Sequence, residues 1–359
     1  MCRGQRLYLG SSFNLDQQSR GKHSVAVNMK SAGGQKVIQD LSEKSDVILD
    51  PFRPGVMERL GCGPGRFILK WFGINIDCSD VLLERNPELI FARLSGFGQT
   101  GPMSDLPGHD INYIAQSGVL SALVDANGKP IPPINLVADF AGGGLLLTNG
   151  ILAALFERTK SGQGQVLDLS MAEGSAYASS FLWQMGHMFN ESRGQNMLDG
   201  GAHFYGTYQT KDNRYMAVGA IEPQFYAVLI EKLGLSNQID LGEQMDSSKW
   251  PEMKTLFENT FQQKTQFEWS KIFEGSEACT SPILTFEEAA VDPHNVAREA
   301  FFDAEGVTVP SPQPIFSRSK SERETVRPDV GENTKDILKS ELQYSEEQIQ
   351  NLFRDGAIA

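Results

Sequence analysis

Apolar residues in the first part of the chain follow two different spacings. They alternate with polar residues over residues 24–29 and recur every three or four positions over residues 34–46. A short apolar run at residues 47–49 follows, and then a helix-like segment that ends at Leu60. Alternation is typical of a strand with one buried face, and the wider spacing is typical of an amphipathic helix. A strand, a helix and a strand in this order predict a βαβ unit, and therefore an α/β fold built on a parallel sheet.

Similar elements continue to residue 188. Residues 80–85 predict a helix and residues 89–94 a strand, after which residues 95–102 form a glycine-rich turn. A loop that follows the C-terminal end of a strand is where α/β sheets place their ligands, so this turn is a candidate binding segment. Three more elements are predicted in this part of the chain: a long helix at residues 139–159, a strand at residues 166–169 and a buried helix at residues 171–188.

The pattern changes after Gly201. Two β-like runs, at residues 204–210 and 215–219, flank a polar turn at residues 211–214 and predict a β-hairpin. Helix-like segments that contain tryptophan and phenylalanine follow, up to a helix that starts near Thr285. This part of the chain is therefore predicted to be a second, smaller α+β domain.

Composition and charge exclude several classes of protein. The chain has 359 residues, enough for two domains, and its 40% hydrophobic and 21% charged residues are typical of a globular protein. The 45 acidic residues outnumber the 32 basic ones, and the resulting net charge of −13 argues against a general binder of nucleic acids or membrane surfaces. The four cysteines are Cys2, Cys62, Cys78 and Cys279. They lack the spacing of a metal site, so no metal site is predicted.

Targeting and membrane signals are not visible in the sequence. Residues 1–6 are not followed by the apolar segment of a secretory signal. The longest apolar run, at residues 144–156, is interrupted by polar residues and is too short to cross a bilayer. Residues 355–359 are not a peroxisomal address of the Ser-Lys-Leu type. We therefore expect no membrane span.

The segment at residues 108–144 carries the strongest candidate chemistry. His109 follows a glycine at the start of this segment, and Asp139 stands three residues before three consecutive glycines at its end. Asp139 is predicted to be the N-cap of the helix that follows. Glycine lets a ligand approach the backbone closely, and free amides at a helix N-terminus stabilise an anion or a developing oxyanion.

Two acid–base groups beside a polarising backbone suit one type of reaction. One group removes the proton next to a carbonyl group, and the other returns a proton to the opposite face of the same carbon. Both residues also have an ordinary structural explanation, because an aspartate before a helix is usually a cap and a histidine in a glycine turn is often a loop residue. Residue chemistry alone therefore leaves the function open.

Seven segments of the chain, taken together, resemble a known family. They share their sequence motifs with the racemases of the family III CoA-transferase superfamily, and the resemblance covers most of residues 19–300. As a set the motifs are highly specific. The segments are residues 20–22, 45–53, 92–99, 108–113, 138–144, 193–201 and 218–225.

The resemblance implies a fold that is completed by an interlocked homodimer. Each subunit of this family has a Rossmann-like CoA-binding domain, a smaller domain and a C-terminal segment that returns to the first domain, and the site lies between subunits. We therefore expect the large CoA-binding α/β domain at residues 1–195, the small α+β domain at residues 196–305 and the returning segment at residues 306–359. No metal or redox cofactor is implied, because CoA is part of the substrate.

The resemblance also implies a reaction, the racemisation of 2-methylacyl-CoA thioesters in branched-chain fatty acid and bile acid metabolism. The reaction passes through a planar enolate, and His109 takes the proton of the S epimer whereas Asp139 takes that of the R epimer. Glu222 is expected to orient His109 or stabilise its charge, with Asp110 nearby. Contacts with the acyl-CoA are expected from Lys30, Arg53 and Arg93, and contacts around the thioester oxygen from Gly108, Ile111, Asn112 and Tyr113.

Two stretches depart from the family pattern. The family begins with a βα unit ahead of Lys22, and the resemblance implies that about thirty residues, the size of one such building block, are absent here. Residues 65–79 interrupt a stretch that is normally continuous. The family works in peroxisomes and mitochondria, and the lack of a visible targeting signal leaves the cytoplasm as an alternative compartment.

Two other functional hypotheses stay open. In CoA-transferases of the same superfamily, an aspartate at the Asp139 position is a nucleophile that forms an anhydride and then a thioester intermediate. His109 favours the racemase, because a transferase needs no second base. The other alternative is a truncated chain without activity. A thermal melt with and without CoA separates it from a working enzyme, because a ligand that binds the native state raises its stability.

Overall fold

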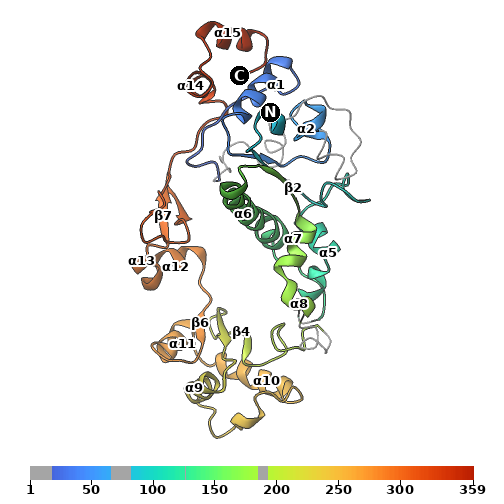
Figure 1. Ribbon diagram of the computed structural model, residues 1–359. Coiled ribbons are helices and arrows are strands. Elements are labelled where there is room, and N and C mark those ends of the chain that lie inside the picture. The colour runs from blue at the N-terminus through green and yellow to red at the C-terminus, as the bar shows by residue number, and fades with distance from the viewer. Residues whose placement is uncertain (1–17, 66–81, 126, 185–192) are drawn as a thin grey trace. The chain divides into compact units, whose positions relative to one another are not determined.

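The computed structural model describes residues 18–65, 82–125, 127–184 and 193–359 of the chain (Figure 1). The chain divides into two compact units. The first comprises Met1–Tyr113, Leu136–Ser175 and Ala290–Ala359, and the second comprises Ile114–Asn135 and Ala176–Ala289. Apart from Gly65, the stretch at residues 65–79 that departs from the family pattern lies outside the described residues. The domain boundaries near residues 195 and 305 stay a prediction.

The first unit is built on a parallel sheet of three strands. In spatial order these are β1 (Val47–Asp50), β2 (Ile90–Ser95) and β3 (Gln165–Ser170), with β2 in the centre. The first three residues of β2 are fully buried, because a central parallel strand is covered on both faces. The three strands predicted at these positions are confirmed, and so is the α/β class of the fold.

Helices connect and cover these strands, and α6 packs on β2. In chain order, the helices up to α7 are α1 (Ala32–Ser42), α2 (Val56–Arg59), α4 (Leu82–Arg85), α5 (Asp110–Gln116), η1 (Val119–Ala122), η2 (Leu136–Leu145), α6 (Leu146–Ser161) and α7 (Met171–Ala178). The helix predicted at residues 34–46 is therefore found as α1. It begins where the hydroxyl of Ser31 accepts the amide of Gly34 at 3.0 Å, as expected of an N-cap.

The strand predicted at residues 24–29 is not formed. This stretch makes an isolated bridge between Val27 and Ile358, and the Asn28 amide donates to the Ala357 carbonyl at 2.8 Å. The C-terminal helices α14 (Thr334–Ser340) and α15 (Glu346–Arg354) lie beside α1 (Figure 1), and the three helices share an apolar cluster. Val27 is thus half-buried against the C-terminus, which is remote in sequence, and the stretch does not enter a sheet.

The long helix predicted at residues 139–159 begins earlier than expected. The π-helix η2 runs directly into α6, so Leu136–Ser161 is one helical segment of 26 residues, which contains an 18-residue stretch with a mean hydropathy of 1.5. By length and composition alone it could cross a membrane, a property that it shares with core helices of soluble proteins. The apolar run at residues 144–156 is therefore part of a longer helical segment, and the absence of a membrane span stays an expectation.

The helix predicted at residues 171–188 is broken and less buried than expected. It is observed as α7 and the short α8 (Ser180–Gln184), and the residues from 185 to 188 lie outside the described part. Tyr177 and Trp183 are 71% and 67% exposed in the single chain. Apolar composition predicted burial, but composition does not tell which surface covers a side chain.

Helices η2 and α7 cross at two glycines. A Cβ atom added to Gly142 would lie 2.4 Å from the backbone nitrogen of Ser175, and one added to Gly174 would lie 2.0 Å from the carbonyl oxygen of Gly142. No larger residue fits at either position without moving the helices apart. The crossing also brings the Met171 side chain against Gly143, where its Cγ lies 3.2 Å from an added Cβ.

The second unit contains an antiparallel sheet of β4 (Tyr205–Gln209), β5 (Tyr215–Gly219) and β6 (Thr280–Pro282). The predicted hairpin is β4 and β5, and an aromatic core covers it. The remaining elements in chain order are α9 (Pro223–Leu233), η4 (Leu241–Glu243), α10 (Trp250–Phe261), α11 (Gln266–Phe273), α12 (Phe286–Val291), α13 (Pro293–Ala297), β7 (Phe301–Ala304) and β8 (Val307–Pro310). Strands β7 and β8 pair as a hairpin in the first unit.

A buried histidine lies in the aromatic core of the second unit. His203 is fully buried, and its Nε2 lies 2.7 Å from the hydroxyl oxygen of Tyr226. The ring makes edge-to-face contacts with Phe204 and Phe257. Burial lowers the pKa of His203 from 6.5 to about 4, because the apolar core disfavours the charged ring.

Gly142→Ala is expected to destabilise the chain, because its methyl group meets the backbone of α7. Overpacking of this kind costs about 1–3 kcal/mol, so the midpoint of urea-induced unfolding should fall. Gly150→Ala in α6 is the matched control. Its added Cβ meets only Leu167 Cδ1 at 3.7 Å, and alanine in a helix is favoured over glycine by about 1 kcal/mol. Equal midpoints for the two variants would contradict the close crossing.

The free energy of unfolding is expected to fall as the pH drops from 6.5 towards 4. Over this range the unfolded chain protonates His203 whereas the folded chain keeps it neutral, so stability is full above pH 6.5 and about 3 kcal/mol is lost on the way down. Denaturant titrations followed by the fluorescence of the core residues Trp250 and Trp269 measure this loss. His203→Gln should lower stability at pH 7 but flatten its dependence on pH between 6.5 and 5. An unchanged slope in that variant would refute this assignment.

Candidate active site

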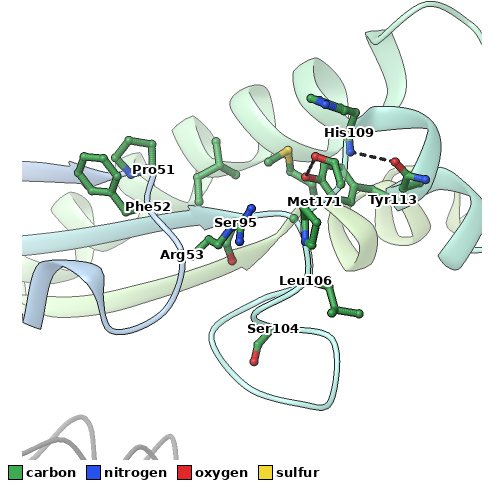
Figure 2. A pocket seen from close by; sticks show the side chains of 14 residues that line it. Pro51, Phe52, Arg53, Ser95, Ser104, Leu106, His109, Tyr113 and Met171 are labelled. Atoms are coloured by element: carbon green, nitrogen blue, oxygen red, sulfur yellow. Dashed lines mark hydrogen bonds between the residues drawn. The ribbon is translucent and has the colours of Figure 1, made fainter. Parts of the chain in front are cut away.

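A pocket of about 510 Å³ lies at the C-terminal ends of the parallel strands (Figure 2). Pro51, Phe52 and Arg53 follow β1, Ser95 ends β2, and Met171 follows β3. The loop from Ser104 to Tyr113 completes the lining. Ligand sites in open α/β sheets occur at this edge, and the glycine-rich turn after β2 was predicted as a binding segment on that basis.

The pocket brings together some of the residues that the sequence singled out and not others. Among them, Arg53, Gly108, His109, Asn112 and Tyr113 line it, whereas Lys30, Arg93, Asp110, Ile111, Asp139 and Glu222 do not. The apolar part of the lining, which includes Phe52, Leu106 and Met171, was not predicted as part of the site. The one feature that could have indicated these apolar residues is their position directly after a strand or in a loop at the end of a strand.

His109 lies at the start of α5, with an exposed side chain. Its amide donates to Oδ1 of Asn112 at 3.1 Å, and its carbonyl accepts the amides of Asn112 at 2.8 Å and Tyr113 at 3.2 Å. These three hydrogen bonds fix the backbone of His109 in the loop. Figure 2 shows His109 and Tyr113 across the pocket from Pro51, Phe52 and Arg53.

The ring of Tyr113 occupies the space beside two glycines of the pocket wall. A Cβ on Gly96 would lie 2.3 Å from this ring, and a Cβ on Gly108 would lie 2.7 Å from it. The Tyr113 hydroxyl donates to the Gly108 carbonyl at 2.5 Å, and the ring contacts Phe97 edge to face at 5.1 Å. The glycine before His109 was predicted to admit a ligand to the backbone, but here an aromatic side chain takes that space.

Two charges of opposite sign act on Tyr113. Burial raises the pKa of its hydroxyl, the carboxylate of Asp139 raises it further, and the guanidinium of Arg53 lowers it. Tyr113 therefore stays protonated near neutral pH and keeps its hydrogen bond to Gly108. Asp139 is not part of the lining, but its carboxylate raises the pKa of a residue that is.

Asp110 connects the His109 loop to the helix that carries Asp139. Its side chain is 3% exposed, and its Oδ2 accepts the amides of Ala138 at 2.7 Å and Asp139 at 2.9 Å. These amides belong to the first turn of η2, so Asp110 caps this helix from a distant part of the chain. The prediction that Asp139 is the N-cap was therefore wrong, because three apolar residues precede it in the helix.

Arg93 is enclosed below the pocket. It is 1% exposed, donates to Oε1 of Gln99 at 2.8 Å and pairs with Glu58, while its Nε lies 3.4 Å from Oδ2 of Asp50. Burial raises the pKa of Asp50, although the Phe52 amide and Arg93 lower it. These contacts favour a structural role for Arg93 over the predicted contact with CoA.

The other predicted site residues lie elsewhere. Lys30 is exposed just ahead of α1, and its amide donates to Oδ1 of Asn28 at 3.2 Å. Glu222 belongs to the second unit, where it is the exposed N-cap residue of α9. In the part of the chain that the structure describes, no group of three or more histidine, cysteine, aspartate or glutamate side chains is arranged to hold a metal ion.

Comparison with known proteins adds independent information. The sequence profile described as CoA-transferase family III matches residues 2–334. The chain is 50% identical over 344 residues to the α-methylacyl-CoA racemase of Mus musculus, covering 95% of this chain and 86% of that protein. It is 47% identical over 353 residues to the α-methylacyl-CoA racemase of Homo sapiens, covering 97% and 88%.

A solved structure shares the fold. The crystal structure of a CAIB/BAIF family protein from Brucella suis has a TM-score of 0.72 and 21% identity to this chain, and the match covers 90% of this chain and 82% of that one. The family profile spans most of the chain, and the two racemases match nearly all of it. The resemblance drawn from the sequence motifs is therefore confirmed: the chain belongs to CoA-transferase family III.

Proposed function

We propose that this chain racemises 2-methyl-branched acyl-CoA thioesters. The observation that carries the proposal is its identity of 50% and 47% to two proteins named α-methylacyl-CoA racemase, over nearly the whole chain. His109 and Asp139, which suit proton transfer, belong to the same structural unit and are linked through Asp110. This link supports the paired action of two bases.

The proposed reaction needs one base on each face of the α-carbon. From the R epimer, the Asp139 carboxylate removes the α-proton, and the electron pair of the broken C–H bond moves into an enolate with its negative charge on the thioester oxygen. Protonated His109 then delivers a proton to the opposite face. The reverse direction starts from neutral His109 and protonated Asp139, so the pair carries one transferable proton in either direction.

The enolate oxygen needs hydrogen-bond donors where its charge develops. We assign this task to the loop at residues 108–113. The amides of Asp110 and Ile111 begin α5 and have no acceptor within the helix, and the N-terminal end of a helix favours negative charge. Asn112 and Tyr113 hold this loop in shape through their hydrogen bonds.

Substrate binding is proposed to use two exposed cations, one of which lines the pocket. Arg53 lines the pocket and Lys30 is exposed ahead of α1, so both are available to the phosphates of CoA. Glu222 is retained as the residue proposed to orient His109. No metal or redox cofactor is proposed, because proton transfer through an enolate needs no electron acceptor.

We also propose that the chain works as a homodimer in peroxisomes or mitochondria, with the cytoplasm as the alternative compartment. Large apolar side chains on the long helix support an oligomer, since Leu145, Leu152 and Phe156 are 70%, 62% and 64% exposed in the single chain. Contiguous exposed apolar surface of this kind is typical of interfaces between proteins.

Incubating a single epimer of a 2-methylacyl-CoA with the purified chain in deuterated water tests the reaction. The substrate should lose optical purity while deuterium enters the α-carbon, because the returned proton comes from a base in exchange with solvent. Mass spectrometry and chiral analysis measure the two quantities. No exchange, in a chain that still gains thermal stability from CoA, would overturn the racemase and favour CoA-transferase chemistry. No exchange and no stabilisation by CoA would point to an inactive chain.

His109→Ala should abolish inversion in both directions and deuterium exchange from the S epimer, while exchange from the R epimer continues through Asp139. Loss of a general base costs about 10²–10⁴-fold in rate. CoA binding, measured by calorimetry, should change little. His294→Ala, at an exposed histidine in α13, is the matched control and should behave as the unmodified chain does. An equal loss of CoA binding in the His109 variant would count against its role as a base.

A further inference from the structure

We propose that Asp110 is the residue that positions the Asp139 base, by holding the first turn of η2 against the His109 loop. The inference rests on the proposed racemase function, in which Asp139 acts on the R epimer. It assigns to the side chain of Asp110 no contact with the substrate and no proton transfer of its own. Asp110 instead acts through the backbone of the helix that carries the base.

The geometry of Asp110 supports this role. One carboxylate oxygen, Oδ2, accepts two successive amides, from Ala138 at 2.7 Å and from Asp139 at 2.9 Å. The second of these amides belongs to the proposed base itself, so any shift of the cap moves the Cα atom of Asp139. The side chain is 3% exposed, which leaves water little access to replace it.

The helix that Asp110 caps needs such support at this end. Asp139 lies in the first turn of η2, where backbone amides have no acceptor within the helix. Farther along η2, the crossing at Gly142 and Gly174 fixes the helix against α7. Asp110 holds the N-terminal end of η2. The helix is therefore fixed at Asp139 by this cap and one turn later by the crossing at Gly142.

The position of Asp110 in the chain links the two bases. It follows His109 directly, and the backbone of His109 is held by three hydrogen bonds to the next turn of α5. One residue therefore joins the backbones of both bases through a single peptide unit and two hydrogen bonds. Loss of the Asp110 carboxylate releases η2, whereas the bonds that hold His109 to Asn112 and Tyr113 stay in place.

This asymmetry gives a kinetic signature that general loss of stability does not give. If Asp139 is displaced while His109 is not, the S epimer still loses its α-proton to His109 and regains a deuteron from the same face. The S epimer then exchanges without inversion, whereas exchange and inversion of the R epimer fall together. Inversion must fall by the same factor in both directions, because the equilibrium between the epimers is fixed.

The test compares Asp110→Ala, Asp110→Asn and Asp292→Ala with the unmodified chain. Each epimer is incubated separately in deuterated water, and exchange and inversion are followed. Asparagine keeps an oxygen acceptor for the two amides, so it should restore most of the activity that alanine loses. Asp292 is the matched control, since its Oδ1 also accepts two helix-start amides, from His294 at 3.0 Å and Asn295 at 3.3 Å.

Asp110→Ala should lower inversion by about 10²-fold, as expected for a base displaced by about 1 Å, and it should leave exchange of the S epimer much less affected. Asp292→Ala should leave both processes unchanged. An equal loss of exchange from both epimers would overturn the positioning role, and so would activity that Asp110→Ala does not alter.

A second measurement keeps the inference separate from the proposed function. Amide hydrogen exchange over residues 136–145, read by mass spectrometry, should rise in Asp110→Ala and stay unchanged in Asp292→Ala. If the unmodified chain does not racemise, the proposed function fails, and this readout alone still shows whether Asp110 holds η2. Unchanged protection in Asp110→Ala would overturn the inference even in an active enzyme.

Discussion

The hydrogen bonds between the Asp110 carboxylate and the first amides of the long helix connect the parts of the candidate site. A helix begins with amides that have no partner within it, and burying them without an acceptor is costly. A negative charge placed there also interacts favourably with the helix dipole. Asp110 directly follows His109 in the chain. The residue that accepts the first amides of this helix therefore also connects the backbones of the two proposed bases.

The strand ends below the pocket depend on a second polar cluster. Arg93 is buried with Glu58 and Asp50, and removing one member would leave a buried charge without a partner. Burial raises the pKa of Asp50 and also that of Asp168, which accepts the Gln99 amide at 3.2 Å. Because these residues lie on β1, α2, β2 and β3 and on the turn after β2, the cluster fixes the loops that line the pocket.

Local sequence patterns predicted the elements that depend on near neighbours. The three parallel strands, the hairpin at residues 205–219 and α1 were all found where the pattern of apolar positions indicated. The failures involve distant contacts. Residues 24–29 have the alternation of a strand, yet their hydrogen bonds run to Ala357 and other C-terminal residues, which local spacing cannot reveal.

The candidate site shows the same division. The sequence by itself determined the candidates for proton transfer, His109 and Asp139 with glycines around them, and the motifs that identify CoA-transferase family III. Tertiary structure alone decided that Asp110, and not Asp139, caps the helix, and that Tyr113 fills the space beside Gly108. The physical reason is that residue type fixes what a side chain can do, whereas its hydrogen-bond partner is chosen by whichever group the fold brings within about 3 Å.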